Sequence, residues 1–293
     1  YTNNVEIIMI IWLTSYPKSG NTWVRALISA YLYSEDGKFN FDDLNKIEQF
    51  PSKNYLSPFL DNFNDPINAP KYWIPAQNKI NLTKKIMFFK THNALCTIDG
   101  HKFTDKNNTL ASIYVVRDPR NVITSIANHY DLSAEKAYEF LINKRKIIFT
   151  KNITDKGKSF EEKGNVHFVG SWEEHYKSWQ NIRFAPIKII KYENLINDVE
   201  STFLSVLKFL SNFISIEIKE KKIQQVVKTC SFDALKKKEK KEGFPEAPIL
   251  EEKNKKVVFF NLGKANNWKK KLDPVIEKKI RSKFSLEMNE LGY

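Results

Sequence analysis

The sequence of 293 residues has little cysteine and no long apolar run. Its two cysteines, Cys96 and Cys230, exclude a disulfide framework and a zinc site built from several cysteines, and they fit a reducing compartment. The most apolar stretch, residues 5–13, spans about nine residues, whereas a membrane-spanning helix needs about twenty. The start of the sequence also lacks a basic leader with a small-residue cleavage site. We therefore expect a cytoplasmic protein without a membrane span.

Arginine is scarce as well, although the chain is basic. Only six of the 47 lysine and arginine residues are arginines, and the net charge at pH 7 is +13. A surplus of this size points to a polyanionic partner or an anionic ligand. Proteins that grip phosphates at many points use arginine forks besides lysine, and the sequence has no interleaved RNA-binding motif. A polyanion-binding protein stays an alternative, nucleic acid is not expected, and generic surface charge explains the lysines equally well.

The sequence does have the material for a substantial core. Hydrophobic residues make up 42% of it and aromatic residues 13%, which excludes a disordered chain. Short runs rich in Ile, Val and Phe predict strands at about 7–14, 86–90, 112–116 and 187–191. Helical periodicity predicts helices at 21–33, 119–130, 134–143, 172–181, 194–211, 217–229 and 274–290. Strands without polar alternation are typical of a sheet covered on both faces. The predicted fold is therefore α/β, with three layers (α/β/α) and a central, mainly parallel sheet.

The remaining segments predict long surface loops within one domain. They are residues 40–81, 150–170 and 236–267, the last dense in Lys and Glu. The sequence has no internal repeat and no Gly/Ser linker between two halves. We expect a single domain over residues 9–293, with residues 1–8 as an extension. One helix start is explicit, because Ser171 followed by Glu174 predicts a capping box.

An anion site is predicted directly after the first strand. Residues 14–23 read T-S-Y-P-K-S-G-N-T-W and lead into a helix. Free backbone N–H groups and the positive end of the helix point at a ligand in such a turn. Lys18 adds a charge, and Ser19 and Thr22 add hydroxyl donors. The turn is not a Walker A loop, because the lysine precedes Gly20.

A metal-dependent nucleotide phosphotransferase with a divergent phosphate loop is a second alternative. It needs Mg²⁺ and an acidic ligand at the end of a strand. No carboxylate in the sequence has an evident place of that kind.

Taken together with later blocks, residues 14–23 resemble the sulfotransferase family, whose loop reads T-Y-P-K-S-G-T-T-W; Asn21 stands in a Thr position. The later blocks follow in the family's order. They are K-T-H at 90–92, Y-V-V-R-D-P-R-N-V-I-T-S at 114–125, G-S-W-E-E-H at 170–175, Y-E-N-L at 192–195 and C-S-F at 230–232. The resemblance extends from Thr14 to Trp268 and implies a P-loop-like α/β fold and a sulfotransferase.

The resemblance also implies a donor, 3′-phosphoadenosine 5′-phosphosulfate (PAPS), its product 3′-phosphoadenosine 5′-phosphate (PAP), and no metal. Two separate anion sites would hold the donor's charges. The binding residues that it implies are Lys18, Ser19, Gly20, Asn21 and Thr22 for the phosphosulfate, Arg117 and Ser125 for the 3′-phosphate, and Trp23, Tyr192 and Phe232 for the adenine.

Three residues would carry the chemistry by this resemblance. Lys18 neutralises the leaving oxygen, Lys90 stabilises the sulfuryl group, and His92 is the general base for an in-line transfer. The acceptor is a hydroxyl or an amine of an unidentified small molecule, glycolipid or saccharide. We expect no comparable setting for the other histidines, His101, His129, His167 and His175.

The sequence departs from the family near its end. Family members often read R-K-G-x-x-G-D-W, whereas residues 261–268 read N-L-G-K-A-N-N-W. Gly263 is kept, but the Arg and Lys that clamp the 3′-phosphate are missing. We expect Lys264 to substitute as a point charge, with poorer geometry than a guanidinium. A dimer motif of animal family members is also absent, so the oligomeric state stays open.

Overall fold

The fold is built on a five-stranded sheet in the order β2-β3-β1-β6-β9, in which every neighbouring pair is parallel. The structure is a computed structural model that describes residues 9–60, 68–83, 85–149, 166–247, 249–250 and 255–293. The strands are β1 (Ile10–Ser15), β2 (Glu48–Gln49), β3 (Met87–Thr91), β6 (Thr109–Val116) and β9 (Ile187–Lys191). The predicted α/β class is confirmed, with β2 as a strand that the sequence did not predict.

Strand β1 shows why the predicted strands lack polar alternation. Ile10 and Trp12 belong to one hydrophobic cluster, and Ile11 and Leu13 belong to the other. Successive side chains of a strand point to opposite faces, so an apolar residue is needed at every position when both faces are covered.

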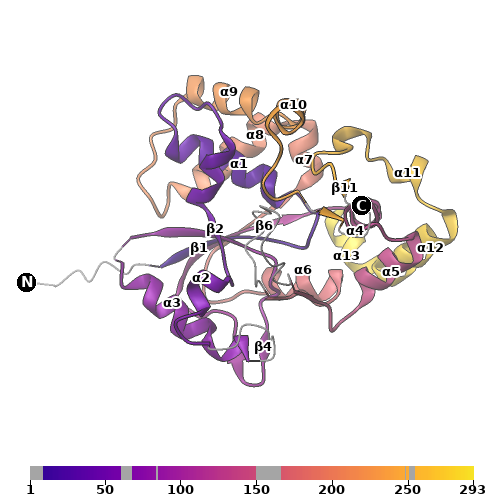
Figure 1. Ribbon diagram of the computed structural model, residues 1–293, viewed down its shortest axis with the longest axis horizontal. Helices are drawn as coiled ribbons and strands as arrows, with labels where there is room; N and C mark the ends of the chain where they lie inside the picture. The colour runs from indigo at the N-terminus through magenta and orange to yellow at the C-terminus, as the bar shows by residue number, and fades with distance from the viewer. Residues whose placement is uncertain (1–8, 61–67, 84, 150–165, 248, 251–254) are drawn as a thin grey trace, which may run out of the picture.

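Helices cover the two faces of the sheet (Figure 1). On one side lie α1 (Asn21–Tyr33), α8 (Val199–Leu210), α9 (Glu220–Thr229) and α10 (Phe232–Glu242). On the other side or at its end lie α2 (Lys53–Leu56), α3 (Trp73–Asn81), α4 (Pro119–Tyr130), α5 (Ala134–Ile142), α6 (Trp172–Gln180), α12 (Pro274–Lys283) and α13 (Ser285–Leu291). The predicted three-layer arrangement is confirmed.

Two predicted helices are each broken into two. The prediction over 194–211 becomes α7 (Tyr192–Asn197) and α8, because Asp198 leaves the helical conformation and accepts a hydrogen bond from the backbone of Ser201. The prediction over 274–290 becomes α12 and α13, which meet at the fully buried Phe284. Packing and capping decide these breaks, and helical periodicity does not report them.

The predicted loops contain more structure than expected. Residues 40–81 include the 3₁₀ helices η1 (Phe41–Lys46) and η2 (Ala69–Tyr72), as well as β2, α2 and α3. The loop prediction over 236–267 is wrong up to Glu242, because α10 begins after the N-cap Ser231. The helix η4 (Gly263–Ala265) and α11 (Trp268–Lys271) follow. Residues 150–165 and 251–254 of the predicted loops, and the extension 1–8, lie outside the described residues.

Among the described residues, three short antiparallel pairs lie outside the central sheet. They are β4 (Thr97–Ile98) with β5 (His101–Lys102), β7 (Ile147–Phe149) with β8 (Val166–Phe168), and β10 (Ile249–Leu250) with β11 (Lys255–Lys256).

The carboxyl ends of four parallel strands carry the predicted site residues. The phosphate loop follows β1, His92 follows β3, Arg117 follows β6 and Tyr192 follows β9. Parallel strands end at the same edge of a sheet, where α/β proteins bind their ligands. The sheet therefore brings residues that are far apart in the sequence to one place.

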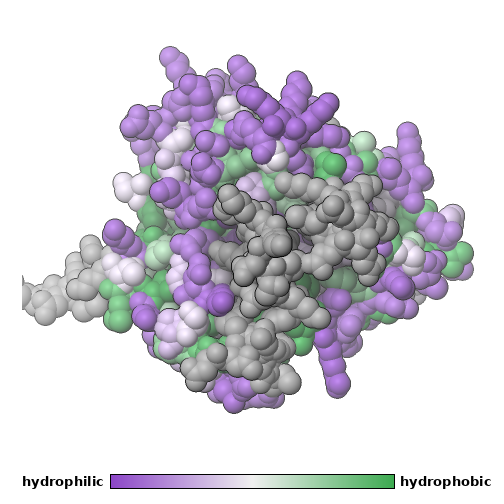
Figure 2. Space-filling model, viewed as in Figure 1, coloured by the Kyte–Doolittle hydropathy of each residue, from purple (hydrophilic) through white to green (hydrophobic). Residues whose placement is uncertain are grey.

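Part of the lysine surplus lies exposed on the surface. Figure 2 shows hydrophilic side chains gathered over α9 and α10, at the top of the view. Among the residues of α10, Lys236, Lys237, Lys240 and Lys241 are exposed. These lysines are solvated charge, as expected for generic surface lysines.

Candidate active site

The turn between β1 and α1 has the geometry of an anion site. Gly20 is the N-cap of α1, with a φ of 107° and no side chain to cap the first turn. Lys18 also has a positive φ, 64°. The first backbone N–H groups of α1 therefore have no side-chain cap, which suits an anion. An added Cβ at Gly20 would lie 2.5 Å from Cδ2 of Tyr192, so only glycine fits.

Two predicted ligands of the phosphate loop face the protein interior. Asn21 is buried, and its Nδ2 donates to the carbonyl oxygen of Leu13 at 3.1 Å, which ties the turn to β1. Ser19 is fully buried, and its Oγ has no hydrogen-bond partner among the described residues. Thr22 lines the cavity described below.

The second predicted anion site lies at the start of α4. Arg117 Nη1 donates to the carbonyl oxygen of Lys18 at 2.9 Å and to Ser125 Oγ at 3.1 Å. The guanidinium carbon lies 4.1 Å from the ring centre of Tyr192, over its face. The buried Nε of Arg117 has no partner among the described residues. Arg117 thus links the two predicted phosphate sites through a direct hydrogen bond.

Asn266, which was not predicted from the sequence, contacts two side chains of α4 at the Arg117 site. Its Nδ2 donates to Ser125 Oγ at 3.0 Å, and its Oδ1 accepts from Thr124 Oγ1 at 2.7 Å. Ser125 Oγ therefore accepts from both Arg117 and Asn266, so its own hydrogen is left to donate to a ligand. The side chain of the predicted substitute, Lys264, lies outside the described part of the chain; its backbone is in η4.

Three aromatic residues, Trp23, Tyr192 and Phe232, pack together beside the phosphate loop. The ring of Trp23 meets those of Tyr192 and Phe232 edge-on, with centroids 5.8 and 6.3 Å away. Its Nε1 donates to the carbonyl oxygen of Cys230 at 2.8 Å. Gly263 packs against the ring of Phe232, since an added Cβ at Gly263 would lie 2.5 Å from that ring. The three aromatic residues predicted for the adenine are thus brought together.

His92 is held in one tautomer by its surroundings. Its Nδ1 lies 2.9 Å from the carbonyl oxygen of Ser15, which only accepts, so Nδ1 carries the hydrogen and Nε2 has a lone pair. Burial, with added repulsion from Lys90 and Lys18, lowers the pKa of His92 to about 4. The ring is neutral near pH 7 and can accept a proton at Nε2.

His175 is hydrogen-bonded to the backbone of His92, contrary to the expectation that the other histidines have no comparable setting. His175 Nε2 donates to the carbonyl oxygen of His92 at 3.1 Å, and its Nδ1 accepts from the Tyr114 hydroxyl at 2.8 Å. Burial lowers the pKa of His175 to about 3, which keeps the ring neutral, as this pattern requires.

Two further histidines belong to the same site, so the expectation was wrong for them too. His129 Nδ1 accepts from Lys18 Nζ at 3.1 Å, and the Lys18 ammonium also lies 4.1 Å from the ring centre of Phe259. Burial, followed by the charge of Lys18, lowers the pKa of His129 far below its ordinary value. The ring of His167 lies 5.9 Å from that of His92.

A half-buried carboxylate pairs with the predicted catalytic lysine. Glu246 Oε1 accepts from Lys90 Nζ at 2.9 Å and from Arg25 Nη1 at 2.5 Å. Burial by itself raises the pKa of Glu246, but attraction to Arg25 and then to Lys90 outweighs it and holds the pKa well below its ordinary range. Neither Arg25 nor Glu246 was predicted. An arginine within the apolar run W-V-R-A-L-I of α1 was the available signal, because a buried arginine needs a partner.

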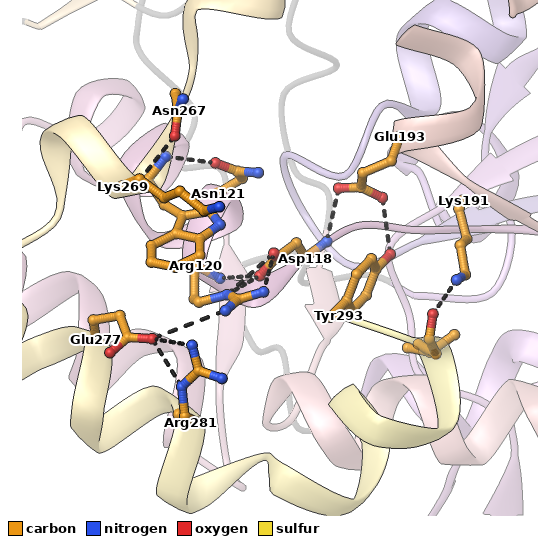
Figure 3. A network of polar contacts seen from close by, with 12 residues as sticks. Asp118, Arg120, Asn121, Lys191, Glu193, Asn267, Lys269, Glu277, Arg281 and Tyr293 are labelled. Atoms are coloured by element: carbon orange, nitrogen blue, oxygen red, sulfur yellow. Dashed lines mark hydrogen bonds and ion pairs between the residues drawn. The ribbon is translucent and has the colours of Figure 1, made fainter. Parts of the chain in front are cut away.

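A network at the start of α4 supports the second anion site (Figure 3). Asp118 receives three side-chain hydrogen bonds from Arg120, whose guanidinium stacks on Trp268 at 4.0 Å. Glu193 accepts from the backbone N–H of Asp118 at 3.1 Å and from the hydroxyl of Tyr293 at 2.9 Å. The residue next to Arg117 is thereby fixed from two sides.

The phosphate loop, the Arg117 site and His92 open into one cavity of about 600 Å³. Most of the predicted site residues line it: Lys18, Gly20, Asn21, Thr22, Trp23, Lys90, His92, Arg117, Ser125, Tyr192, Phe232 and Gly263. Ser19 lies beneath the loop and is not part of this lining. Residues that the sequence analysis missed also line it: Arg25, Gln49, His129, His167, Glu246 and Asn266.

Two other kinds of site are absent from the described residues. None of the helices in this part of the chain is both long and apolar enough to cross a bilayer. In the same residues, no group of three or more His, Cys, Asp and Glu side chains is placed to hold a metal ion.

The phosphate loop, the Arg117 site and His92 open into one cavity at the carboxyl edge of a parallel sheet, which defines an α/β protein with a candidate ligand site at the usual place. The family follows from a direct comparison. The family model described as the sulfotransferase domain matches residues 10–292, and the chain belongs to this family.

Curated relatives are similar at low identity. The luciferin sulfotransferase of Photinus pyralis is 25% identical over 231 residues, which cover 77% of this chain and 56% of that protein. The 3-alpha-hydroxysteroid sulfotransferase of Cavia porcellus is 24% identical over 232 residues, covering 77% and 65%. Cytosolic sulfotransferase 7 of Arabidopsis thaliana is 26% identical over 275 residues, covering 92% and 76%. The chain thus spans 56% to 76% of the length of these three relatives.

A solved structure shows the same fold. The crystal structure of mouse sulfotransferase SULT7A1 complexed with PAP superposes with a TM-score of 0.56 at 16% sequence identity. The match covers 96% of this chain and 84% of that one.

Proposed function

We propose that this protein transfers the sulfuryl group of PAPS to a hydroxyl or an amine of an acceptor. The observation that carries the proposal is the single cavity in which the phosphate loop, the Arg117 site and His92 Nε2 meet. Family membership and the PAP complex of the mouse neighbour support the donor.

The residues present fit such a donor. Arg117 Nε is a buried polar atom without a partner among the described residues, and Arg117 lines the cavity. Gly20 leaves room at the helix start, where backbone N–H groups attract an anion. Trp23, Tyr192 and Phe232 offer apolar faces for the adenine between the two sites.

The proposed transfer needs one base and two cations. The acceptor oxygen forms a bond to sulfur as the bond between sulfur and the bridging oxygen breaks, and the acceptor's proton passes to His92 Nε2. Lys18 balances the charge that appears on the leaving phosphate oxygen. Lys90, at the end of β3, stabilises the sulfuryl oxygens during the transfer.

The decisive experiment is the transfer of radiolabelled sulfate from PAPS, with and without EDTA. We expect EDTA-insensitive transfer that PAP inhibits. The acceptor screen starts with hydroxylated small molecules, since relatives are named for luciferin, hydroxysteroids and a flavonol. It continues with phenols, alcohols, amines, glycolipids and oligosaccharides. Failure to bind PAP, tested by calorimetry, would contradict the proposed donor whatever the acceptor.

The catalytic histidine has a separate test. His92→Ala is expected to lower turnover about 10²-fold to 10⁴-fold while PAP affinity stays close to that of the wild type. Unchanged turnover in this variant removes His92 from the mechanism.

A further inference from the structure

We propose that Glu246 is a positioning residue for the transfer, which fixes the ammonium of Lys90 at the reaction centre. The inference rests on the proposed function, since it assumes that Lys90 stabilises the sulfuryl group. Nothing in the family motifs points to it, because Glu246 lies in the segment G-F-P-E-A-P that follows α10.

The first support is the geometry of the three charges. One oxygen of Glu246, Oε1, accepts from both Lys90 and Arg25. The side chains are shielded from water, with exposed fractions of 12% for Lys90, 20% for Glu246 and 4% for Arg25. Charge pairs are strong in such surroundings, and each partner loses much when another is removed.

The second support is the anchoring of the carboxylate itself. Arg25 lies on α1, and its Nη2 donates to the carbonyl oxygen of Leu44 at 2.6 Å, so it cannot swing freely. Phe244, two residues before Glu246, is fully buried against Phe41 and Phe260. Glu246 therefore reaches Lys90 from a segment that the buried Phe244 anchors.

The consequence concerns what Lys90 is able to do. An ammonium group has three N–H donors on a flexible four-carbon stem, and its position is poorly defined without a fixed partner. A bond to Glu246 defines the place of the nitrogen and still allows it to donate to a second oxygen. The carboxylate adds negative charge near an anionic donor, so it disfavours donor binding while it improves the placement of Lys90. An effect that separates turnover from donor binding is the signature of this role.

The test is a double-mutant cycle between Glu246→Gln and Lys90→Met, measured by single-turnover transfer of labelled sulfate. In the wild-type background, Glu246→Gln is expected to lower the transfer rate about 10-fold or more without raising the KM for PAPS. In the Lys90→Met background, it is expected to change the rate less than about 2-fold, because no ammonium is left to position. Glu242→Gln, which removes an exposed carboxylate paired with Lys238, is the matched control and is expected to leave both parameters unchanged.

Two results overturn the inference: an unchanged rate for Glu246→Gln in the wild-type background, or an equal loss in both backgrounds. If the Gln variant does not fold, as judged by circular dichroism and PAP binding, the same cycle is run with Glu246→Asp. That variant keeps the charge and withdraws it from Lys90 by one methylene, and the same two criteria apply. Absence of transfer by the wild-type protein contradicts the proposed function instead, so the two failures are distinguishable.

Discussion

His175 donates a hydrogen bond from Nε2 to the backbone carbonyl of His92, 3.1 Å away. The bond fixes the backbone of the residue that carries the proposed base, and the Tyr114 hydroxyl fixes His175 in turn. The histidine of the G-S-W-E-E-H segment is thus fully buried and contacts the backbone of His92 without lining the cavity.

Replacement of His175 tests this support. His175→Ala removes the donor to the His92 carbonyl and is expected to lower kcat about 10-fold, because a small displacement of a catalytic group is costly. His175→Gln places an amide N–H near the position of Nε2 and is expected to retain more than a third of wild-type kcat, by the same argument. Both variants are compared by kcat, by the KM for PAPS and by PAP affinity. Equal kcat losses in the two variants would show that the hydrogen bond to His92 is not what matters.

The protonation of His92 has a predicted midpoint. Burial and the nearby Lys90 and Lys18 lower the pKa of His92 to about 4. When no PAPS or PAP is bound, the ring therefore stays neutral until the pH falls well below 6.5, the ordinary pKa of histidine. The base is competent above its pKa and is lost as the pH falls through it. Anionic PAP offsets the two lysines, so we expect the pKa to rise in the PAP complex. An NMR titration of the histidine rings checks both values, with His92→Gln to assign the signal. A midpoint near 6.5 without PAP would contradict the expectation.

The amide of Asn266 is expected to matter for the nucleotide. Asn266→Ala leaves Ser125 Oγ with Arg117 as its remaining described donor, so its hydrogen is no longer directed to the ligand. We expect PAP affinity to fall about 3-fold to 10-fold, in line with about 1 kcal/mol for one hydrogen bond. Asn266→Asp is expected to be worse, because it adds a negative charge beside the phosphate. Asn212→Ala, on the surface after α8, is the control. Calorimetry measures the three affinities, and an unchanged value for Asn266→Ala would refute the role.

A pair of glycine variants separates backbone strain from a steric clash. Gly20→Ala combines a φ of 107° with a Cβ placed 2.5 Å from Tyr192, whereas Gly100→Ala has a φ of 82° and open space around it. We expect about 1 kcal/mol of destabilisation or more from strain in each. PAP binding is expected to be lost in Gly20→Ala alone, since its clash displaces the ring that supports Arg117. Thermal melting and PAP titration of both variants provide the measurement. Normal PAP binding by Gly20→Ala would show that the Tyr192 contact is adaptable.

The fold was predictable because its strongest signals are local. Each strand of the sheet with five or more residues consists mostly of apolar residues, and each long helix has its own periodicity. The breaks at Asp198 and Phe284 depend on capping and packing across elements, so a pattern along one segment does not contain them. The two-residue strand β2 is too short to show a period at all.

The site was predictable where its residues share a motif. Lys18 to Trp23, the K-T-H block and the pair Arg117 and Ser125 could be read together, because each set lies within a short stretch. Glu246 meets Lys90 across 156 residues, and Asn266 meets Ser125 across 141 residues. Contacts of that range depend on how the strands and loops are folded together, and an isolated carboxylate or amide in a lysine-rich segment gives no sign of them.

The bond between Tyr293 and Glu193 has a practical consequence for the preparation of this protein. It joins residues that are 100 positions apart. Glu193 also accepts a hydrogen bond from the backbone N–H of Asp118, the residue after Arg117. Proteolysis after α12 would remove α13 and Tyr293, and with them the hydrogen bond to Glu193. The proposed nucleotide site would then lose a support, although the cleaved bond lies outside that site. Intact mass at this end of the polypeptide is therefore a quality criterion for any batch whose nucleotide affinity is to be compared with another.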